Sequence, residues 1–116
     1  MNLYGLKIIY QYTVEDDVFY EEQIVTTKAE SFDEAYQKAW DYARAYCDEH
    51  LNPDGEKVIQ SVYDVADCYL ADDEEDEVKE VYSSFKKNWT VLSDEKFIDV
   101  LSDGCTAEEL KALRYK

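Results

Sequence analysis

Hydrophobic and polar residues alternate along the first part of the chain. Between residues 4 and 14, Tyr, Leu, Ile and Val recur at every second position, which is typical of a half-buried β-strand. The acidic turn Glu15–Asp17 separates this stretch from residues 18–27, where Val, Ile, Phe, Tyr and Thr favour a second strand. The pattern therefore predicts a β-hairpin at the start of the chain.

Three- and four-residue spacing of apolar residues predicts a helix after the hairpin. Residues 31–34, Ser-Phe-Asp-Glu, fit a capping box, in which the serine accepts a helix N–H and the glutamate reaches back to the cap residue. The helix is expected to continue to about Leu51 and to end before the turn Asn52–Gly55. Its apolar stripe, which we expect to lie on the sheet, comprises Phe32, Ala35, Tyr36, Ala39, Ala43, Tyr46, Cys47 and His50.

Two further strands are predicted in the second half. Residues 58–70 are rich in Val, Ile and Tyr, and the interruptions at Asp64 and Asp67 indicate a bulge or an edge strand. Six consecutive acids at 72–77 predict an exposed loop because like charges repel one another. Residues 78–85 are then expected to form a fourth strand.

Two short helices are predicted at the C-terminal end. One spans residues 93–101 and ends before Gly104, and the other begins at a second capping box, Thr106–Glu109. The element order is β-β-α-β-β followed by two short helices, within one domain of residues 1–116. This order predicts an α+β fold with a mostly antiparallel four-stranded sheet, covered on one face by the long helix.

The net charge of the chain limits the classes of ligand that it is expected to bind. The chain has 28 Asp and Glu against 12 Lys and Arg, a formal net charge of -16. Residues 1–60 (13 acids, 5 bases) and 61–116 (15 acids, 7 bases) each carry -8. A field of this sign repels nucleic-acid phosphates and anionic membranes, so we expect neither as a ligand. It attracts basic protein partners instead.

Residues that could carry chemistry are sparse. Cys47, Cys68 and Cys105 show no CxxC spacing and the start shows no signal peptide, so we expect reduced thiols in the cytoplasm of a bacterial host cell. His50 falls at the expected helix end, where it caps carbonyl groups. The sequence has no glycine-rich phosphate loop, and the acids at 72–77 lack EF-hand spacing. We therefore predict no cofactor, no metal site and no enzymatic activity.

Eleven tyrosines are the other unusual feature of the composition. Tyrosine combines a large apolar ring with a polar tip and is enriched at protein interfaces. Those at positions 4, 10, 12, 36 and 46 are expected mainly in the core. The interface candidates, which stand among acids, are Tyr20, Tyr63, Tyr69 and Tyr82.

Two segments of the sequence resemble a known type of domain. Residues 27–35, Thr-Lys-Ala-Glu-Ser-Phe-Asp-Glu-Ala, and residues 80–85, Glu-Val-Tyr-Ser-Ser-Phe, resemble a small uncharacterised bacterial α+β domain family over about residues 3–86. This resemblance implies an architecture and carries over no catalytic residue. In size, acidity and tyrosine content, the chain is similar to phage anti-defence proteins, including anti-CRISPR and DNA-mimic proteins, and to toxin-immunity proteins.

The leading hypothesis is a non-enzymatic inhibitor, monomeric or homodimeric, that occupies the basic nucleic-acid-binding surface of a partner nuclease or defence complex. The alternatives are an immunity protein for a toxin nuclease, a small enzyme with His50 or a shielded carboxylate pair in a pocket, and a structural assembly subunit. The acids at 72–77 form a solvated loop, a partner-binding loop or, as the least favoured alternative, a specific calcium site. The residues assigned to the partner contact are Asp64, Asp67, Asp72, Asp73, Glu74, Glu75, Asp76, Glu77, Glu80, Glu15, Asp16, Asp17, Glu21, Glu22, Tyr63, Tyr69 and Tyr82.

Overall fold

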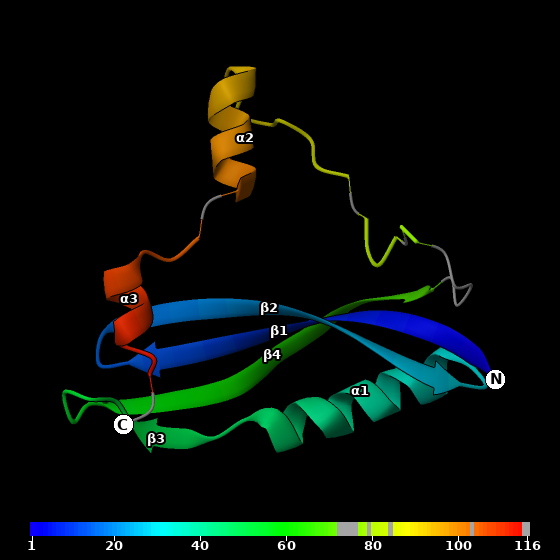
Figure 1. Cartoon of the computed structure of the whole chain (residues 1–116), viewed down its shortest axis with the longest axis horizontal. Coiled ribbons are helices and arrows are strands. Elements are labelled where there is room, and N and C mark those ends of the chain that lie inside the picture. Colours follow the sequence, from blue (N-terminus) through cyan, green and yellow to red (C-terminus); the bar gives the residue numbers. More distant parts are fainter. Residues whose placement is uncertain (72–76, 79, 84, 103, 115–116) are drawn as a thin grey trace.

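The computed structural model describes residues 1–71, 77–78, 80–83, 85–102 and 104–114. Strands β1 (Asn2–Val14), β2 (Asp17–Ala29), β3 (Glu49–Leu51) and β4 (Lys57–Leu70) form one antiparallel sheet in the order β2-β1-β4-β3. Helix α1 (Phe32–Tyr46) runs along one face of this sheet, and α2 (Asp94–Ser102) and α3 (Ala107–Lys111) follow β4 (Figure 1). The expected α+β class with a four-stranded antiparallel sheet is confirmed.

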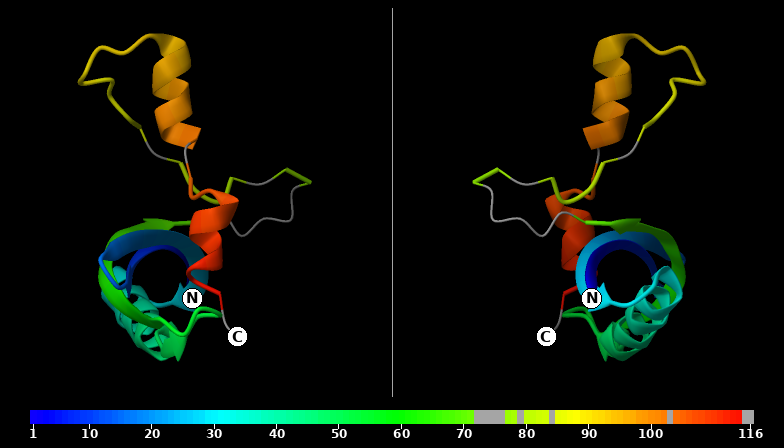
Figure 2. Two further views of the ribbon diagram at one scale, coloured as in Figure 1. Left: turned by 90° about the vertical axis from the view of Figure 1, so that its left-hand side faces the viewer. Right: turned by 90° about the vertical axis from the view of Figure 1, so that its right-hand side faces the viewer.

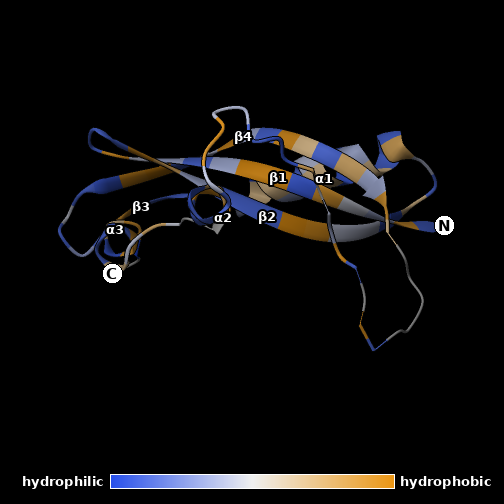
Figure 3. Cartoon of the chain, turned by 90° about the horizontal axis from the view of Figure 1, so that it is seen from above, coloured by the Kyte–Doolittle hydropathy of each residue, from blue (hydrophilic) through white to orange (hydrophobic). Residues whose placement is uncertain are grey.

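The first hairpin forms as the alternation predicts. β1 and β2 stay in register from the pair Asn2 and Ala29 to the pair Val14 and Asp17. Glu15 takes a left-handed conformation (φ 53) in the two-residue turn between them. Because side chains alternate along a strand, every second residue of β1 faces α1, and hydropathy alternates along the strands (Figure 3).

The core lies between α1 and the sheet face turned toward it, which we call the inner face. Ser31 caps α1 by accepting a hydrogen bond from the Glu34 N–H, which is one half of the predicted capping box, while the Glu34 carboxylate pairs with Lys38 (3.1 Å). The predicted stripe of α1 does lie on the sheet, and its buried members are alanines, which let the helix backbone approach closely. The buried residues of this core are Tyr4, Leu6, Ile8, Tyr10, Ala29, Ala35, Ala39, Ala43 and Val65.

The long helix is shorter than predicted. α1 ends at Tyr46 because Cys47 is extended (φ -73, ψ 143), and Glu49–Leu51 form β3 in place of a further helical turn. The predicted position of His50 at a helix end is therefore wrong: it lies in a strand. The turn after Leu51 joins β3 to β4, and Gly55 adopts φ 80 there.

Strand β4 is irregular, and only its start, Lys57–Ile59, lies between β1 and β3. Its register against β1 shifts twice, which leaves Tyr63 and Ala66 without a partner on β1. The bulge indicated by Asp64 and Asp67 is confirmed, and at these two residues β4 is also an edge of the sheet among the described residues, because β3 pairs only with Lys57–Ile59. Bulges increase the local twist of a strand, and the end views show the sheet curled around α1 (Figure 2).

The predicted fourth strand at 78–85 is wrong. None of the residues described in this stretch belongs to a strand, and Val78 and Phe85 are fully or almost fully exposed. Tyr82 is half-buried. The fourth position in the sheet belongs to β3, which pairs with the start of β4.

Both predicted C-terminal helices are confirmed. In α3 the Thr106 hydroxyl accepts from the Glu109 N–H (3.2 Å) and the Glu109 carboxylate accepts from the Thr106 N–H (2.7 Å), so the capping box is complete. Side chains of the β3–β4 hairpin bind the chain just after α3 through the carbonyls of Ala112 and Leu113. None of the helices in the described ranges is long and apolar enough to cross a membrane.

Candidate functional site

The face of the sheet turned away from α1, here called the outer face, gathers many of the predicted contact residues. Cross-strand pairing places Glu22 and Asp64 on either side of Ile9, and Asp67 beside Lys7. Directly paired residues point to the same face, so these carboxylates share it. The predicted residues on or against the outer face are Tyr20, Glu22, Tyr63, Asp64, Asp67, Tyr69 and Tyr82.

Tyr20 and Tyr63 form an exposed aromatic pair on the outer face. Their ring centroids lie 5.8 Å apart in an edge-to-face arrangement that bridges the central strand β1. Gln11, on β1 between them, donates a hydrogen bond to the Tyr20 hydroxyl (3.0 Å). Tyr20 is 57% exposed and Tyr63 64% exposed. The pair is therefore held in place by its neighbours while most of its surface stays available for contact.

Lys7 lies beside this pair beneath Tyr82. Its ammonium pairs with the Glu22 carboxylate at 2.8 Å, and its side chain is only 12% exposed. The hydrogen bond to Glu22 raises the pKa of Lys7, so the ammonium stays charged. The Tyr82 ring covers Lys7 at 5.3 Å, contacts Tyr69 at 5.4 Å, and its hydroxyl reaches the Asp67 carboxylate at 3.5 Å. Tyr82 thus attaches the segment after β4 to the outer face.

Gly5 makes room for Tyr69 on this face. The two residues are cross-strand partners, and a Cβ atom at Gly5 would overlap the Tyr69 ring. Burial raises the pKa of the Tyr69 hydroxyl, which has no hydrogen-bond partner within the described part of the chain. Tyr69 and Tyr82 therefore pack against the sheet, whereas Tyr20 and Tyr63 project from it.

The other predicted contact residues lie elsewhere. Glu21, which follows Tyr20 on β2, faces the inner side. Glu15, Asp16 and Asp17 are exposed at the turn between β1 and β2. The exposed residues Glu77 and Glu80 follow β4. The residues that lie outside the described ranges are Asp72, Asp73, Glu74, Glu75 and Asp76.

A cavity of about 450 Å³ opens on the inner face, beyond the C-terminal end of α1. Strands of the sheet and the last residue of α1 form one wall, and the segment around α3 forms the other. The wall residues used below are Tyr12, Phe19, Glu21, Tyr46, Gln60, Cys105, Leu110 and Leu113.

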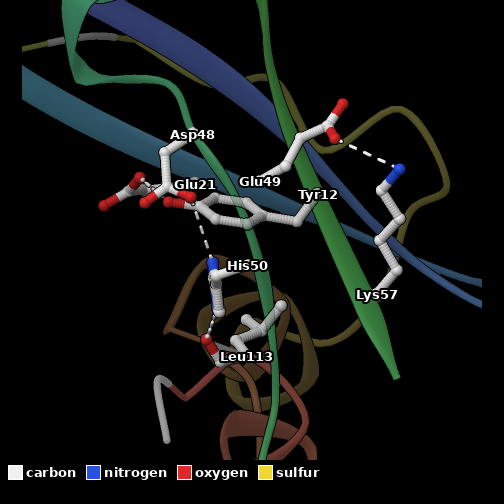
Figure 4. A network of polar contacts seen from close by, with 7 residues as sticks. All are labelled: Tyr12, Glu21, Asp48, Glu49, His50, Lys57 and Leu113. Atoms are coloured by element: carbon white, nitrogen blue, oxygen red, sulfur yellow. Dashed lines mark hydrogen bonds and ion pairs between the residues drawn. The ribbon is translucent and has the colours of Figure 1, made fainter. Parts of the chain in front are cut away.

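Glu21 is the carboxylate in this cavity. One of its oxygens accepts the Tyr12 hydroxyl (2.8 Å) and the other accepts the Tyr46 hydroxyl (3.2 Å). Burial and the Glu21 charge raise the pKa of both tyrosines, so their protons stay on the phenols. Across the described ranges Glu21 takes part in no ion pair. Figure 4 shows Tyr12 pointing its hydroxyl toward this carboxylate.

His50 holds the segment that closes the cavity. Its Nδ1 lies 3.3 Å from an Asp48 carboxylate oxygen, and its Nε2 lies 3.0 Å from the Leu113 carbonyl (Figure 4). Asn52 is fully buried and donates to the Ala112 carbonyl (2.9 Å). These contacts position the cavity wall around Leu113.

The thiols are the remaining groups that could carry chemistry. Burial raises the pKa of Cys47 and Cys68, and Cys105 is exposed. Within the residues that the structure describes, no three His, Cys, Asp or Glu side chains lie close enough to share a metal ion.

The buried phenols predict a loss of stability at alkaline pH. The pKa values of Tyr10 and Tyr12 are raised above the ordinary value of 10.0, mainly by burial. The folded state therefore keeps protons that the unfolded state releases, and the stabilisation present below about pH 10 is lost as pH rises toward the folded pKa. Urea unfolding between about pH 8 and pH 12 should show this loss, and it should be smaller in Tyr12→Phe. Parallel pH profiles for the two proteins would contradict the assignment.

Sequence reasoning missed two wall residues of the cavity, Phe19 and Gln60. Both pair directly with Tyr12, Phe19 from β2 and Gln60 from β4. Hairpin register could have found Phe19, because the short turn fixes its partner on β1. The pairing of Gln60 depends on contact between distant segments and has no local signal.

Comparison with known proteins identifies a matching domain family. A family model described as a domain of unknown function, DUF4288, matches residues 3–83. No curated protein and no solved structure matches the chain significantly. The expected resemblance to an uncharacterised family is confirmed, and nothing in the comparisons supports the likeness to phage anti-defence or toxin-immunity proteins. Since the match spans most of the chain, including the whole sheet and α1, the chain belongs to the DUF4288 family.

Proposed function

We propose that this chain is a non-enzymatic acidic binding protein that occupies the basic, nucleic-acid-binding surface of a partner nuclease or defence complex. The observation that carries the proposal is the exposed Tyr20 and Tyr63 pair on the outer face, with Glu22 and Asp64 beside it. Exposed tyrosines held by neighbours act as anchors at interfaces because little side-chain freedom is lost on binding. Carboxylates around them select a cationic partner.

The charge of the chain supports the same partner class. A net charge of -16 speeds encounter with a basic surface through electrostatic steering, and this effect weakens as salt rises. On the outer face, Glu22 already neutralises Lys7, so Asp64 and Asp67 provide the charge available to a partner. Binding should therefore depend on salt and compete with nucleic acid.

The alternative functions use other features. An immunity protein for a toxin nuclease would use the same outer face and differs only in its partner. The cavity on the inner face contains one carboxylate among the described residues, Glu21, and His50 bonds to Leu113 rather than lining it. No specific observation therefore favours a small enzyme over a binding protein.

The test compares the chain with a Tyr20→Ala/Tyr63→Ala variant. Both proteins serve as bait in a lysate of the native host at low and moderate salt, and mass spectrometry identifies what is captured. We expect a nuclease or nucleic-acid-binding complex on the unmodified chain. Titration with the purified partner should show at least about tenfold weaker binding by the variant, the scale expected for aromatic anchors.

Tyr42→Ala is the matched control, because Tyr42 is an exposed tyrosine on α1, away from the outer face. It should bind as the unmodified chain does, and nucleic acid should displace the partner from both. Capture of a partner that binds the double variant equally well, or that nucleic acid does not displace, would refute the proposal.

A further inference from the structure

The cavity beneath α3 contains an unpaired negative charge in an aromatic setting. Glu21 uses one lone pair on each oxygen for the Tyr12 and Tyr46 hydroxyls, and a carboxylate has about four such acceptor sites. Acceptor capacity is therefore left over at a half-buried group. Among the described residues that line the cavity there is no lysine, arginine or histidine to neutralise it.

The other residues of the cavity wall suit the apolar part of a ligand. Phe19, Leu110 and Leu113 supply hydrocarbon surface, and the Tyr12 and Tyr46 hydroxyls donate to the carboxylate. Aromatic rings attract cations through the negative potential of their faces, and they hold ammonium groups especially well when a carboxylate is near. An anion would meet repulsion here, and a neutral ligand would leave the Glu21 charge unpaired.

Gln60 adds an independent sign of an unfilled site. Its side chain is a wall residue of the cavity, only 8% exposed, and its Nε2 has no hydrogen-bond partner among the described residues. Buried amide donors are almost always satisfied in folded proteins, because an unpaired one has lost its bonds to water without replacement.

We propose that this cavity binds an organic ammonium ion, with the cation paired to the Glu21 carboxylate and its apolar part against Phe19 and Leu113. The volume of about 450 Å³ accommodates a ring-sized molecule or an inserted lysine side chain. The pKa values of Tyr12, Tyr46 and Cys47 are all raised partly by the Glu21 charge, in keeping with a negative potential in the cavity. This site lies on the inner face; Tyr20 of the outer-face pair also lines the cavity, but the amine site does not depend on the proposed function of the outer face.

The test varies the ligand charge at constant shape. Isothermal titration calorimetry with 2-phenylethylammonium, 2-phenylethanol and 3-phenylpropionate should show binding of the amine, at least about tenfold weaker binding of the alcohol, and none of the carboxylate. Nα-acetyl-lysine methylamide separates the two sources of the cation. Tighter binding of this compound than of 2-phenylethylammonium would assign the site to a lysine side chain, and weaker binding would assign it to a free amine.

Two matched variants test the position of the site. Glu21→Gln keeps the shape and an acceptor oxygen, and it should weaken amine binding at least about tenfold. Glu22→Gln removes the same charge from the next residue, on the outer face, and should leave amine binding unchanged. Leu110→Trp, which fills the cavity from the α3 side, should abolish amine binding even if Glu21→Gln folds poorly.

Equal binding of amine and alcohol, equal effects of the two Gln variants, or no amine binding at millimolar concentration would each overturn the site. Tyr63→Ala, a variant of the outer face alone, should bind the amine normally. Failure of the cavity and failure of the outer-face proposal can therefore be told apart.

Discussion

Replacing Tyr10 with alanine is expected to lower the free energy of unfolding by about 3–5 kcal/mol, as for other buried aromatic residues. Tyr10 is completely buried at the centre of β1. Its ring packs at 4.9 Å from that of Tyr46, and its hydroxyl donates to the Gln23 side chain at 2.7 Å. Alanine would remove both interactions and leave a cavity between α1 and the sheet that the curled strands cannot close. Urea unfolding followed by circular dichroism measures the change.

Tyr10→Phe separates the two contributions of this side chain. It keeps the ring and removes only the hydrogen bond to Gln23, so the expected loss is about 1 kcal/mol. Tyr63→Ala is the surface control, expected to cost less than about 0.5 kcal/mol. A Tyr10→Phe variant as unstable as Tyr10→Ala would mean that the hydrogen bond, and not the packing of the ring, supports the core.

Asn52→Ala is the second substitution with a large expected effect, about 2–4 kcal/mol, because several buried polar groups lose their partners together. The Asn52 Oδ1 accepts the backbone N–H groups of Asp54 (3.0 Å) and Glu56 (2.9 Å). Its Nδ2 donates to the Glu56 carboxylate (3.0 Å) and to the Ala112 carbonyl (2.9 Å). One fully buried side chain thus closes the β3–β4 turn and holds the chain after α3.

Asn52→Asp distinguishes these two roles. Aspartate keeps the oxygen that accepts the two turn N–H groups but cannot donate to the Ala112 carbonyl or to the Glu56 carboxylate. The two N–H bonds of the turn should persist, whereas the segment after α3 should lose its attachment through Asn52 and keep that through His50. Hydrogen exchange by mass spectrometry should show faster exchange around α3 in Asn52→Asp, and in both α3 and β3 in Asn52→Ala. Unchanged exchange around α3 in both variants would show that Asn52 does not hold it.

The parts of the fold that sequence predicts well are those set by local pattern. The β1–β2 hairpin follows from alternation and a two-residue turn, and the start of α1 follows from the Ser31 cap. β3 could not be predicted because a three-residue strand has no period of its own. Cys47, His50 and Leu51 also continue the helical spacing of α1, so the local pattern indicated the wrong element.

The prediction of a strand at residues 78–85 was wrong for a related reason. Its β-branched and aromatic residues favour a strand, but a strand also needs a partner strand and a buried face. Within the described part of the chain, β2 and the part of β4 beyond Ile59 are sheet edges, yet the described residues of this stretch pair with neither, and Val78, Val81 and Phe85 are exposed. Tyr82 packs on the outer face, over Lys7.

The candidate sites likewise combine residues that local sequence predicts with positions that only long-range pairing determines. The outer-face residues Tyr63, Asp64 and Asp67 belong to a strand that the sequence predicts, so their identity could be proposed, but the bulges that set their positions appear only once β4 pairs with β1. The prediction grouped Glu21 with Glu22, although neighbours on a strand face opposite ways. The cavity depends on how α3 attaches to the β3–β4 hairpin, which no local pattern reveals.

The central place of β1 also determines the order in which the sheet can assemble. Its neighbour β2 follows it directly in the chain, but its other neighbour, β4, comes only after α1 and β3. The hairpin forms through local contacts, whereas the β1–β4 ladder requires closure of a long loop, whose entropy is lost before the new hydrogen bonds form. We therefore expect docking of β4 to be the slow step of folding, and until it occurs the inward side chains of β1 lack their neighbours on β4.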